Sequence, residues 1–81
     1  MFYMYVLKSK KSGSYYIRSC ENIPFRLNQH NAYKVRSTKS KAPWGLIYYK
    51  SFKTRSEAQV REKQIKSWKK RSAIEKLLKH L

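Results

Sequence analysis

Glu62 is the side chain whose place in the sequence first raises a question of chemistry. The chain has 81 residues, with 20 Lys and Arg against four acidic residues, all glutamates, and a formal net charge of +16. At about 100° per residue, Ala58, Glu62 and Ile65 fall on one side of an expected helix, so the acid lies on its apolar stripe. Such an acid could hold a divalent cation, which prefers oxygen ligands. The alternative is an ion pair with Lys66 at i,i+4, and spacing alone favours that alternative.

Four further side chains with chemical potential precede Glu62. Tyr5 and Tyr16 lie in two segments of strand composition, and Arg26 and His30 are four residues apart in a helical segment and share one face. Taken singly, the tyrosines read as sheet aromatics, Arg26 as a solvated residue and His30 as a polar group near a helix end. Taken jointly, an order of strand, strand, helix, strand, helix could gather all five on one side of the fold.

The excess of positive charge predicts a polyanionic partner, because a Lys or Arg that neutralises a phosphate releases condensed counterions. The loop of residues 32–43 has the composition of a phosphate-contacting segment; the alternative is a solvated linker. Its basic residues are Lys34, Arg36, Lys39 and Lys41. A third class of function, a peptide lying on a membrane surface, is suggested only by the cationic C-terminal segments.

Length and composition limit the fold to one small domain over residues 1–81. Hydrophobic residues at 41% and aromatic residues at 15% exceed those of a disordered basic tail. Cys20 is the only cysteine, which excludes an internal disulfide and a multi-cysteine zinc site and predicts a reducing cytoplasmic location. It reads as a small structural thiol, and Trp44 and Trp68 as core residues rather than platforms for stacked bases.

The local signals predict an α+β fold in which a small three-stranded antiparallel sheet is flanked by helices in the order ββαβαα. The third strand, with its apolar run Leu46–Tyr49, has the composition of a central strand. Capping boxes at Thr54 with Glu57, and at Ser72 with Glu75, predict the starts of two closing helices. The expected strands are Phe2–Lys8, Ser14–Arg18 and Trp44–Phe52. A short helix is expected after an N-cap at Asn22, with Pro24 in its first turn and Phe25–Asn31 continuing it, then a helix from Thr54 to about Lys70 and a terminal helix from Ser72.

The order of these segments resembles the GIY-YIG nuclease superfamily, in particular small stand-alone members related to the N-terminal domain of a bacterial excision-repair endonuclease. The match covers nearly the whole chain and preserves the spacing from the second tyrosine to the arginine, the histidine and the glutamate. It is carried by the segments Tyr3-Met4-Tyr5-Val6-Leu7, Tyr15-Tyr16-Ile17-Arg18-Ser19, Arg26-Leu27-Asn28-Gln29-His30-Asn31 and Arg61-Glu62-Lys63-Gln64-Ile65-Lys66.

The resemblance implies a metal-dependent endonuclease that hydrolyses DNA with one Mg²⁺ or Mn²⁺ held by Glu62. It implies that Tyr5 orients or deprotonates the attacking water with support from Tyr16, and that Arg26 neutralises charge on the phosphate. His30 is then a proton-transfer or phosphate-orienting group. The scarcity of acids in the chain agrees with a single cation. A role in DNA repair or recombination with weak sequence preference is expected, and whether the DNA is branched or double-stranded is left open.

Several positions depart from the family pattern. The first motif's glycine and isoleucine are Tyr3 and Met4, and the second motif's glycine is Arg18, which should emerge on the same face as Tyr16. Cys20 stands where threonine is usual and Tyr33 where a loop glycine is usual. Arg18 could obstruct the site or could bind a phosphate with its guanidinium. The alternative function is therefore a catalytically impaired nucleic-acid-binding module with the same fold.

Overall fold

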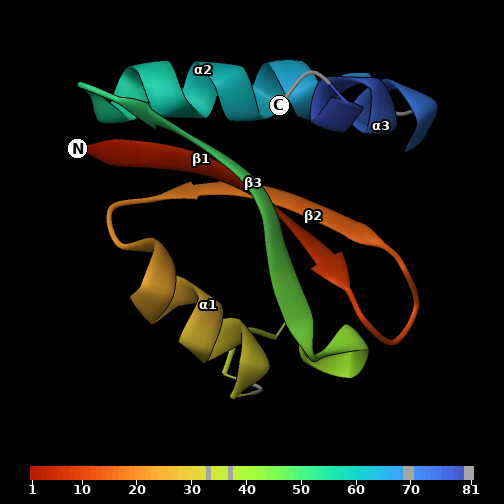
Figure 1. Cartoon of the computed structure of the whole chain (residues 1–81). Coiled ribbons are helices and arrows are strands. Elements are labelled where there is room, and N and C mark those ends of the chain that lie inside the picture. The colour runs from red at the N-terminus through yellow and green to blue at the C-terminus, as the bar shows by residue number, and fades with distance from the viewer. Residues whose placement is uncertain (33, 37, 69–70, 80–81) are drawn as a thin grey trace.

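The computed structural model describes the whole chain except residues 33, 37, 69–70 and 80–81 (Figure 1). The order of elements confirms the predicted α+β fold and its ββαβαα sequence. The elements are β1 (Phe2–Ser9), β2 (Tyr15–Cys20), α1 (Ile23–Asn31), a short 3₁₀ helix η1 (Lys39–Lys41), β3 (Trp44–Phe52), α2 (Arg55–Lys66) and α3 (Arg71–Lys79).

The sheet is antiparallel with the strand order β2-β1-β3, so β1 lies in the centre. Its residues Met4–Leu7 are all buried. The prediction that Trp44–Phe52 forms the central strand is therefore wrong, because β3 lies at an edge of the sheet. Its apolar run has another cause: helices cover both faces of the sheet, and both sets of β3 side chains pack against them.

Helix α1 covers one face of the sheet, and α2 and α3 cover the other (Figure 1). Because side chains alternate along a strand, Tyr5 and Leu7 of β1 face α1, whereas Met4 and Val6 face α2 and α3. Pairing of Tyr5 with Arg18 and of Val6 with Ile17 continues this alternation into β2. Arg18 of β2 therefore lies on the α1 side of the sheet, and Ile17 lies on the side of α2 and α3.

Two of the predicted helix starts are confirmed. The Asn22 side chain accepts a hydrogen bond from the Phe25 amide at 3.0 Å, and Thr54 accepts one from the Glu57 amide at 3.2 Å. Helix α2 ends earlier than predicted, at Lys66, where the Ser67 hydroxyl donates to the Gln64 carbonyl at 2.6 Å. The predicted end near Lys70 lies outside the described residues.

The predicted capping box at Ser72 is wrong. Helix α3 already begins at Arg71, so Ser72 lies inside its first turn. Glu75 instead pairs with Arg71, whose Nε lies 3.2 Å from the carboxylate. Ile74 and Leu77 of α3 pack against the core, which gives the apolar side of this helix a protein partner.

No helix in the described part of the chain is long and apolar enough to cross a lipid bilayer. The cytoplasmic location expected from the sequence stays a prediction.

Candidate active site

A chain of buried hydrogen bonds joins β1, α1 and the loop that follows α1. The Tyr5 hydroxyl lies 3.1 Å from His30 Nε2, and His30 Nδ1 lies 2.8 Å from the Thr38 hydroxyl oxygen. Tyr5 is 1% exposed, and His30 and Thr38 are 0% exposed. Both ring nitrogens of His30 therefore have partners inside the protein, and the ring has no surface from which to contact a phosphate.

The direction of these hydrogen bonds depends on the single proton of the Thr38 hydroxyl, which can donate to the Val35 carbonyl at 3.3 Å. With the proton on that carbonyl, Thr38 accepts from His30 Nδ1, and His30 Nε2 accepts from Tyr5; with the proton on His30 Nδ1, the His30 Nε2–H donates to Tyr5 instead. Both arrangements require a neutral imidazole, and the first requires the proton on Nδ1. Burial lowers the pKa of His30, and the nearby positive charges of Arg26 and Arg18 lower it further, which favours the same neutral form.

Tyr5 and Tyr16 differ in their access to solvent. Burial, together with Cys20 and Tyr16, raises the pKa of Tyr5 to about 12 although Arg26 acts in the opposite direction, so Tyr5 is protonated at neutral pH. Tyr16 is only half-buried. Its ring meets the His30 ring edge to face at a centroid distance of 5.2 Å and the Trp44 ring at 5.9 Å.

Arg26 lies on α1 beside these groups. It is half-buried, and its Nη1 donates to Gln29 Oε1 at 3.0 Å. Its charge influences the pKa values of both Tyr5 and His30. Burial raises the pKa of the nearby Cys20 thiol, and this outweighs the lowering by a hydrogen bond with the Asn22 backbone and by the charge of Arg26. A thiol with a raised pKa is less reactive, which agrees with the structural role predicted for Cys20.

Glu62 approaches from the opposite layer, on α2. Its Oε1 accepts a hydrogen bond from the Ser19 hydroxyl at 2.8 Å, and its Oε2 lies 2.8 Å from Lys66 Nζ. The Glu62 side chain is 13% exposed. The i,i+4 ion pair favoured by spacing is thus present. The acid also packs against β2, on the same stripe as the buried residues Ala58 and Ile65.

Burial raises the pKa of the Glu62 carboxyl, but the hydrogen bonds from Lys66 and Ser19 and the charges of Lys66 and Arg18 outweigh it, so the pKa is lowered overall. The group is a carboxylate at neutral pH. No cluster of three or more His, Cys, Asp or Glu side chains occurs among the described residues. One carboxylate beside a hydroxyl suits a cation such as Mg²⁺, which keeps several waters and takes phosphate oxygens as its other ligands.

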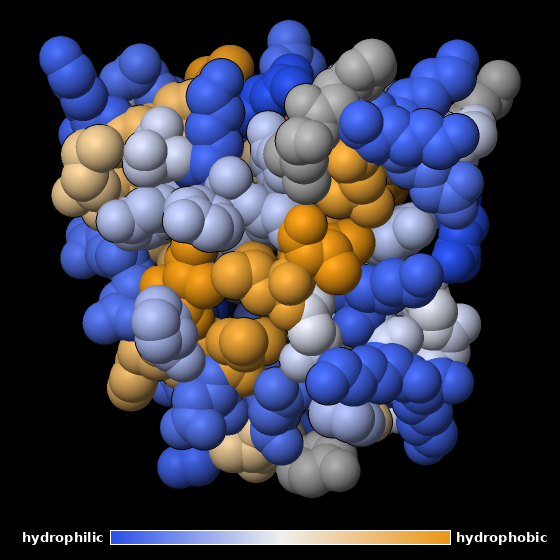
Figure 2. Space-filling view, in the orientation of Figure 1, coloured by the Kyte–Doolittle hydropathy of each residue, from blue (hydrophilic) through white to orange (hydrophobic). Residues whose placement is uncertain are grey.

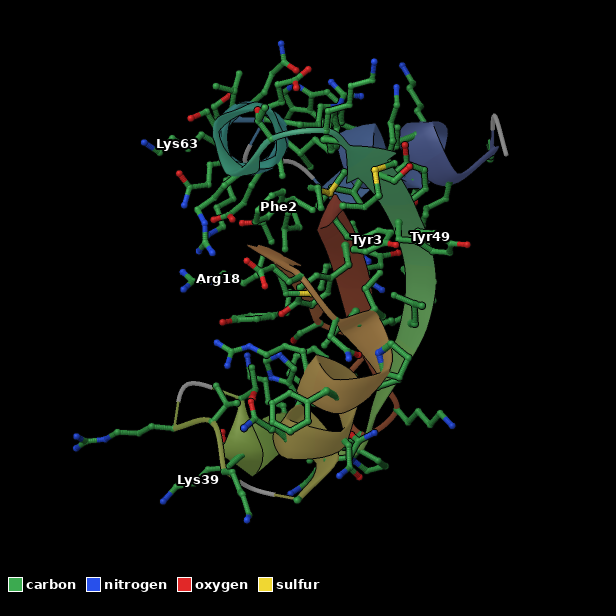
Figure 3. All side chains as sticks on the ribbon, turned by 90° about the vertical axis from the view of Figure 1, so that its left-hand side faces the viewer. Phe2, Tyr3, Arg18, Lys39, Tyr49 and Lys63 are labelled. Atoms are coloured by element: carbon green, nitrogen blue, oxygen red, sulfur yellow. The ribbon has the colours of Figure 1, made fainter. Side chains whose placement is uncertain are left out.

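Arg18 lies between the Tyr5–His30 cluster on the α1 face and Glu62 on the α2 face. It is exposed, and on β2 it pairs across the strands with Tyr5 of β1. Paired residues share a face, so Arg18 lies on the α1 face together with Tyr16, as predicted. Its charge lowers the pKa values of both His30 on one layer and Glu62 on the other. Figure 3 shows the side chain projecting at the β2 side of the molecule, between α2 and α1 and away from Tyr49.

The predicted basic contacts of the loop are all exposed: Lys34, Arg36, Lys39 and Lys41. Lys39 extends on the same side of the molecule as Arg18 and as Lys63 of α2 (Figure 3). Trp44 is buried and its indole N–H donates to the Thr38 carbonyl at 2.9 Å, so its predicted core role is confirmed. Trp68 is half-buried beside the core. Tyr33 lies outside the described residues.

The other side of the molecule has a different character. Apolar side chains gather over β3 there (Figure 2), and a groove of about 470 Å³ opens beside them. It is lined by Tyr3, Glu21, Asn22, Ile23, Pro24, Leu46 and Tyr49. None of the five candidate residues lines this groove, so its size alone does not locate the chemistry.

Sequence reasoning missed two contributors. Ser19 supports Glu62, and Thr38 supports His30, each through a side-chain hydrogen bond. Alternation along β2 places Ser19 on the face opposite Arg18, but pairing it with Glu62 requires the position of α2 over the sheet. No signal in the sequence distinguishes Thr38 from the other polar residues of its loop.

Comparison with known proteins identifies the family. A sequence model described as the GIY-YIG catalytic domain matches residues 1–77. UPF0213 proteins from Staphylococcus haemolyticus (strain JCSC1435) and from Staphylococcus saprophyticus are each 34% identical over 73 residues, which is 89% of this chain and 88% of the relative. A UPF0213 protein from Bacillus pumilus (strain SAFR-032) is 36% identical over 67 residues, covering 82% of this chain and 67% of the relative. No solved structure matches significantly.

The family model covers nearly the whole chain, and the relatives are small proteins of similar length. GIY-YIG domains are nuclease domains, which act on nucleic acid and generally use divalent metal ions. The chain belongs to the GIY-YIG catalytic domain family, among the small stand-alone proteins of the UPF0213 group.

Proposed function

We propose that this protein is an endonuclease that hydrolyses phosphodiester bonds in DNA with one Mg²⁺ or Mn²⁺ held by Glu62. The observation that carries the proposal is the hydrogen bond of 2.8 Å from Ser19 to Glu62, because Ser19 lies on the strand that also presents Tyr16 and Arg18. Glu62 and Tyr16 lie on opposite faces of the sheet, and both adjoin β2, an edge strand, which supports their acting at one edge of the molecule. The likeness to an excision-repair nuclease supports a role in DNA repair or recombination.

Glu62 fits a cation ligand because it is ionised, half-buried and supported by Ser19. A cation bound there would polarise the scissile phosphate and stabilise the leaving oxygen. Lys66, which lies 2.8 Å from Oε2, would give up part of this contact. The Lys66 side chain is 41% exposed, so its ammonium would then be available to the DNA backbone.

The two tyrosines exchange the roles expected from the sequence. A residue that orients or deprotonates the attacking water must be reachable by water, and Tyr16 is only half-buried whereas Tyr5 is 1% exposed. We therefore assign the water contact to Tyr16. Tyr5 and His30 form the buried support behind it, and His30 positions the two aromatic rings instead of contacting the phosphate.

Two arginines supply positive charge to the phosphate. Arg26 has five N–H donors, of which one engages Gln29, and it neutralises charge that develops during cleavage. Arg18 holds a neighbouring phosphate at the β2 edge, a bidentate contact that its planar guanidinium suits. Lys34, Arg36, Lys39 and Lys41 contact the backbone further along the DNA. Backbone contacts carry no direct sequence information, so weak sequence preference is expected.

Cleavage of supercoiled plasmid in Mg²⁺ or Mn²⁺ tests the proposal, with Glu62→Gln as the decisive variant. The substitution keeps the size of the side chain and removes the charge that would hold the cation. The transition state would then lose several kcal/mol of stabilisation, and the rate would fall by about 10³-fold. Glu75→Gln is the matched control, because Glu75 is exposed and its only ion pair among the described residues is with Arg71 on α3. Equal nicking by wild type and Glu62→Gln would assign the activity to a contaminant and overturn the proposal.

The second candidate function is a binding module that has lost turnover, and the specific feature that favours it is Arg18 in place of the motif glycine. Its exposed guanidinium stands between the two groups of residues that would have to act together. In that case DNA binding persists, and no cleavage accompanies it in either metal.

A further inference from the structure

Thr38 is a buried residue within an exposed, basic segment. Lys34, Arg36, Lys39 and Lys41 are all exposed, whereas Thr38 is 0% exposed. A hydroxyl is placed at such a position only if its hydrogen bonds repay its removal from water. The partners of Thr38 therefore indicate what this segment does.

Thr38 uses both its side chain and its main chain. Its hydroxyl oxygen lies 2.8 Å from His30 Nδ1 and 3.3 Å from the Val35 carbonyl oxygen, and its carbonyl accepts from Trp44 Nε1 at 2.9 Å. Its amide donates to the Val35 carbonyl at 3.1 Å. Thr38 is thus fixed to the helix before the loop and to the strand after it.

Hydrogen bonds also anchor the two ends of the loop. The Asn31 side chain accepts from the Trp44 amide and donates to the Trp44 carbonyl, the latter at 3.0 Å. At the far end of the loop, the Ser9 hydroxyl donates to the Lys41 carbonyl at 2.6 Å. The exposed Lys39 directly follows Thr38 in the chain, and Thr38 is hydrogen-bonded to His30. A contact that restrains Lys39 therefore also restrains a partner of His30.

We propose that Thr38 is a positioning residue that fixes the orientation and tautomer of His30 and couples DNA contact by the basic loop to the Tyr5–His30–Tyr16 cluster. This inference rests on the proposed nuclease function. We assign the Thr38 hydroxyl proton to the Val35 carbonyl, so His30 protonated at Nδ1 donates to Thr38 and its Nε2 is left to accept from Tyr5. A phosphate held by Lys39 steadies Thr38, and through it the rings against which Tyr16 packs.

Two substitutions separate the hydrogen bond from the shape of the side chain. Thr38→Val keeps the volume and branching but removes the hydroxyl, and Thr38→Ser keeps the hydroxyl. Nitrogen NMR of the imidazole reports the tautomer directly and does not depend on cleavage. We expect wild type and Thr38→Ser to show His30 protonated at Nδ1, and Thr38→Val to lose that preference. Protonation of wild type at Nε2 would overturn the proposal even if the protein proves to be a nuclease.

Kinetics test the coupling. Loss of one orienting hydrogen bond should lower kcat of Thr38→Val by roughly tenfold with KM little changed, and Thr38→Ser should restore it. Lys39→Ala should lower kcat in wild type but have no further effect on kcat in Thr38→Val. Independent, multiplicative effects of the two changes on kcat would refute the coupling. A wild type without any nuclease activity would refute the proposed function, while the NMR measurement would still decide the role of Thr38.

Discussion

The two faces of the sheet contribute to the candidate site in opposite ways. On the α1 face, Tyr5, His30 and Thr38 are buried, uncharged and joined by hydrogen bonds of 2.8 to 3.1 Å. On the α2 face a single carboxylate, Glu62, is charged, partly exposed and paired with a surface lysine. The first arrangement is complete within the protein, whereas the second can exchange its Lys66 partner for another cation.

The α1 face therefore supplies fixed geometry, and the α2 face supplies charge. An uncharged hydrogen-bonded chain in a low-dielectric interior holds its geometry without a ligand, since its groups have partners there. A partly exposed acid keeps its charge, and its ion pair with Lys66 adds little stability because such pairs are screened by solvent. Changes in the buried Tyr5–His30–Thr38 chain should therefore affect both stability and rate, and changes at Glu62 should affect mainly rate. Each of the following predictions tests this division.

The tyrosines test the division within the α1 face itself. Tyr16→Phe should lower kcat by about 10²-fold or more, the range of a positioned proton-transfer group, with little change in the free energy of unfolding. Tyr5→Phe should lower stability by about 1 kcal/mol, because it removes the buried hydrogen bond with His30 Nε2, and should affect kcat less. Single-turnover cleavage and urea unfolding measure the two effects.

The reverse pattern would contradict these assignments. If Tyr5→Phe abolished cleavage with no change in unfolding while Tyr16→Phe remained active, Tyr5 would be the residue in contact with water, as the sequence alone indicates. Thr54→Ser is a suitable control, since it keeps the hydroxyl of an exposed N-cap far along the chain from both tyrosines.

Arg18 tests whether the two faces act as one site. As a phosphate contact, its loss in Arg18→Gly should raise KM by about tenfold or more, the usual cost of a charge-assisted hydrogen bond. Arg18→Ala serves as control for backbone freedom, because both variants lose the guanidinium. A rise in cleavage for Arg18→Gly would instead show that the arginine obstructs the site and would favour the impaired binding module.

Much of this arrangement was accessible from the sequence because it depends on local patterns. The N-caps at Asn22 and Thr54 and the alternation that places Arg18 with Tyr16 follow from spacing along one segment. The i,i+4 pair of Glu62 and Lys66 is of the same kind. Such features require no knowledge of how distant segments pack.

The remaining features depend on contacts between distant segments. Strand composition could not place β3 at the edge, since helices on both faces give an edge strand the same apolar run as a central one. The bond from Ser19 to Glu62 spans 43 positions in the sequence, and that from Tyr5 to His30 spans 25. The assignment of roles to the two tyrosines needed their burial, which their similar strand contexts do not distinguish.

Salt dependence tests whether the basic loop contacts the DNA backbone. Lys39→Ala should weaken DNA binding a few-fold and reduce the slope of log affinity against log salt by about 0.7 to 0.9, the contribution of one phosphate contact. Lys50→Ala on β3, across the sheet from β2, is the matched control and should leave the slope unchanged. Fluorescence anisotropy over a series of salt concentrations measures both. An equal effect of the two changes would indicate diffuse attraction rather than contact by the loop.

The smallest effect concerns acid stability and isolates the α1 face. The pKa of His30 is lowered from its ordinary value of 6.5, mainly by burial and further by Arg26 and Arg18, so below pH 6.5 the unfolded chain binds a proton that the folded protein excludes. The stabilisation is therefore fully present above pH 6.5 and is lost as the pH falls through the folded-state pKa. Urea unfolding at a series of pH values should show this decline in wild type and in His80→Asn, which retains His30 as its only histidine, and should show it much reduced in His30→Asn. A decline of equal size in His30→Asn would mean that the imidazole is not held neutral, and the tautomer required by the Tyr5–His30–Thr38 chain would fail with it.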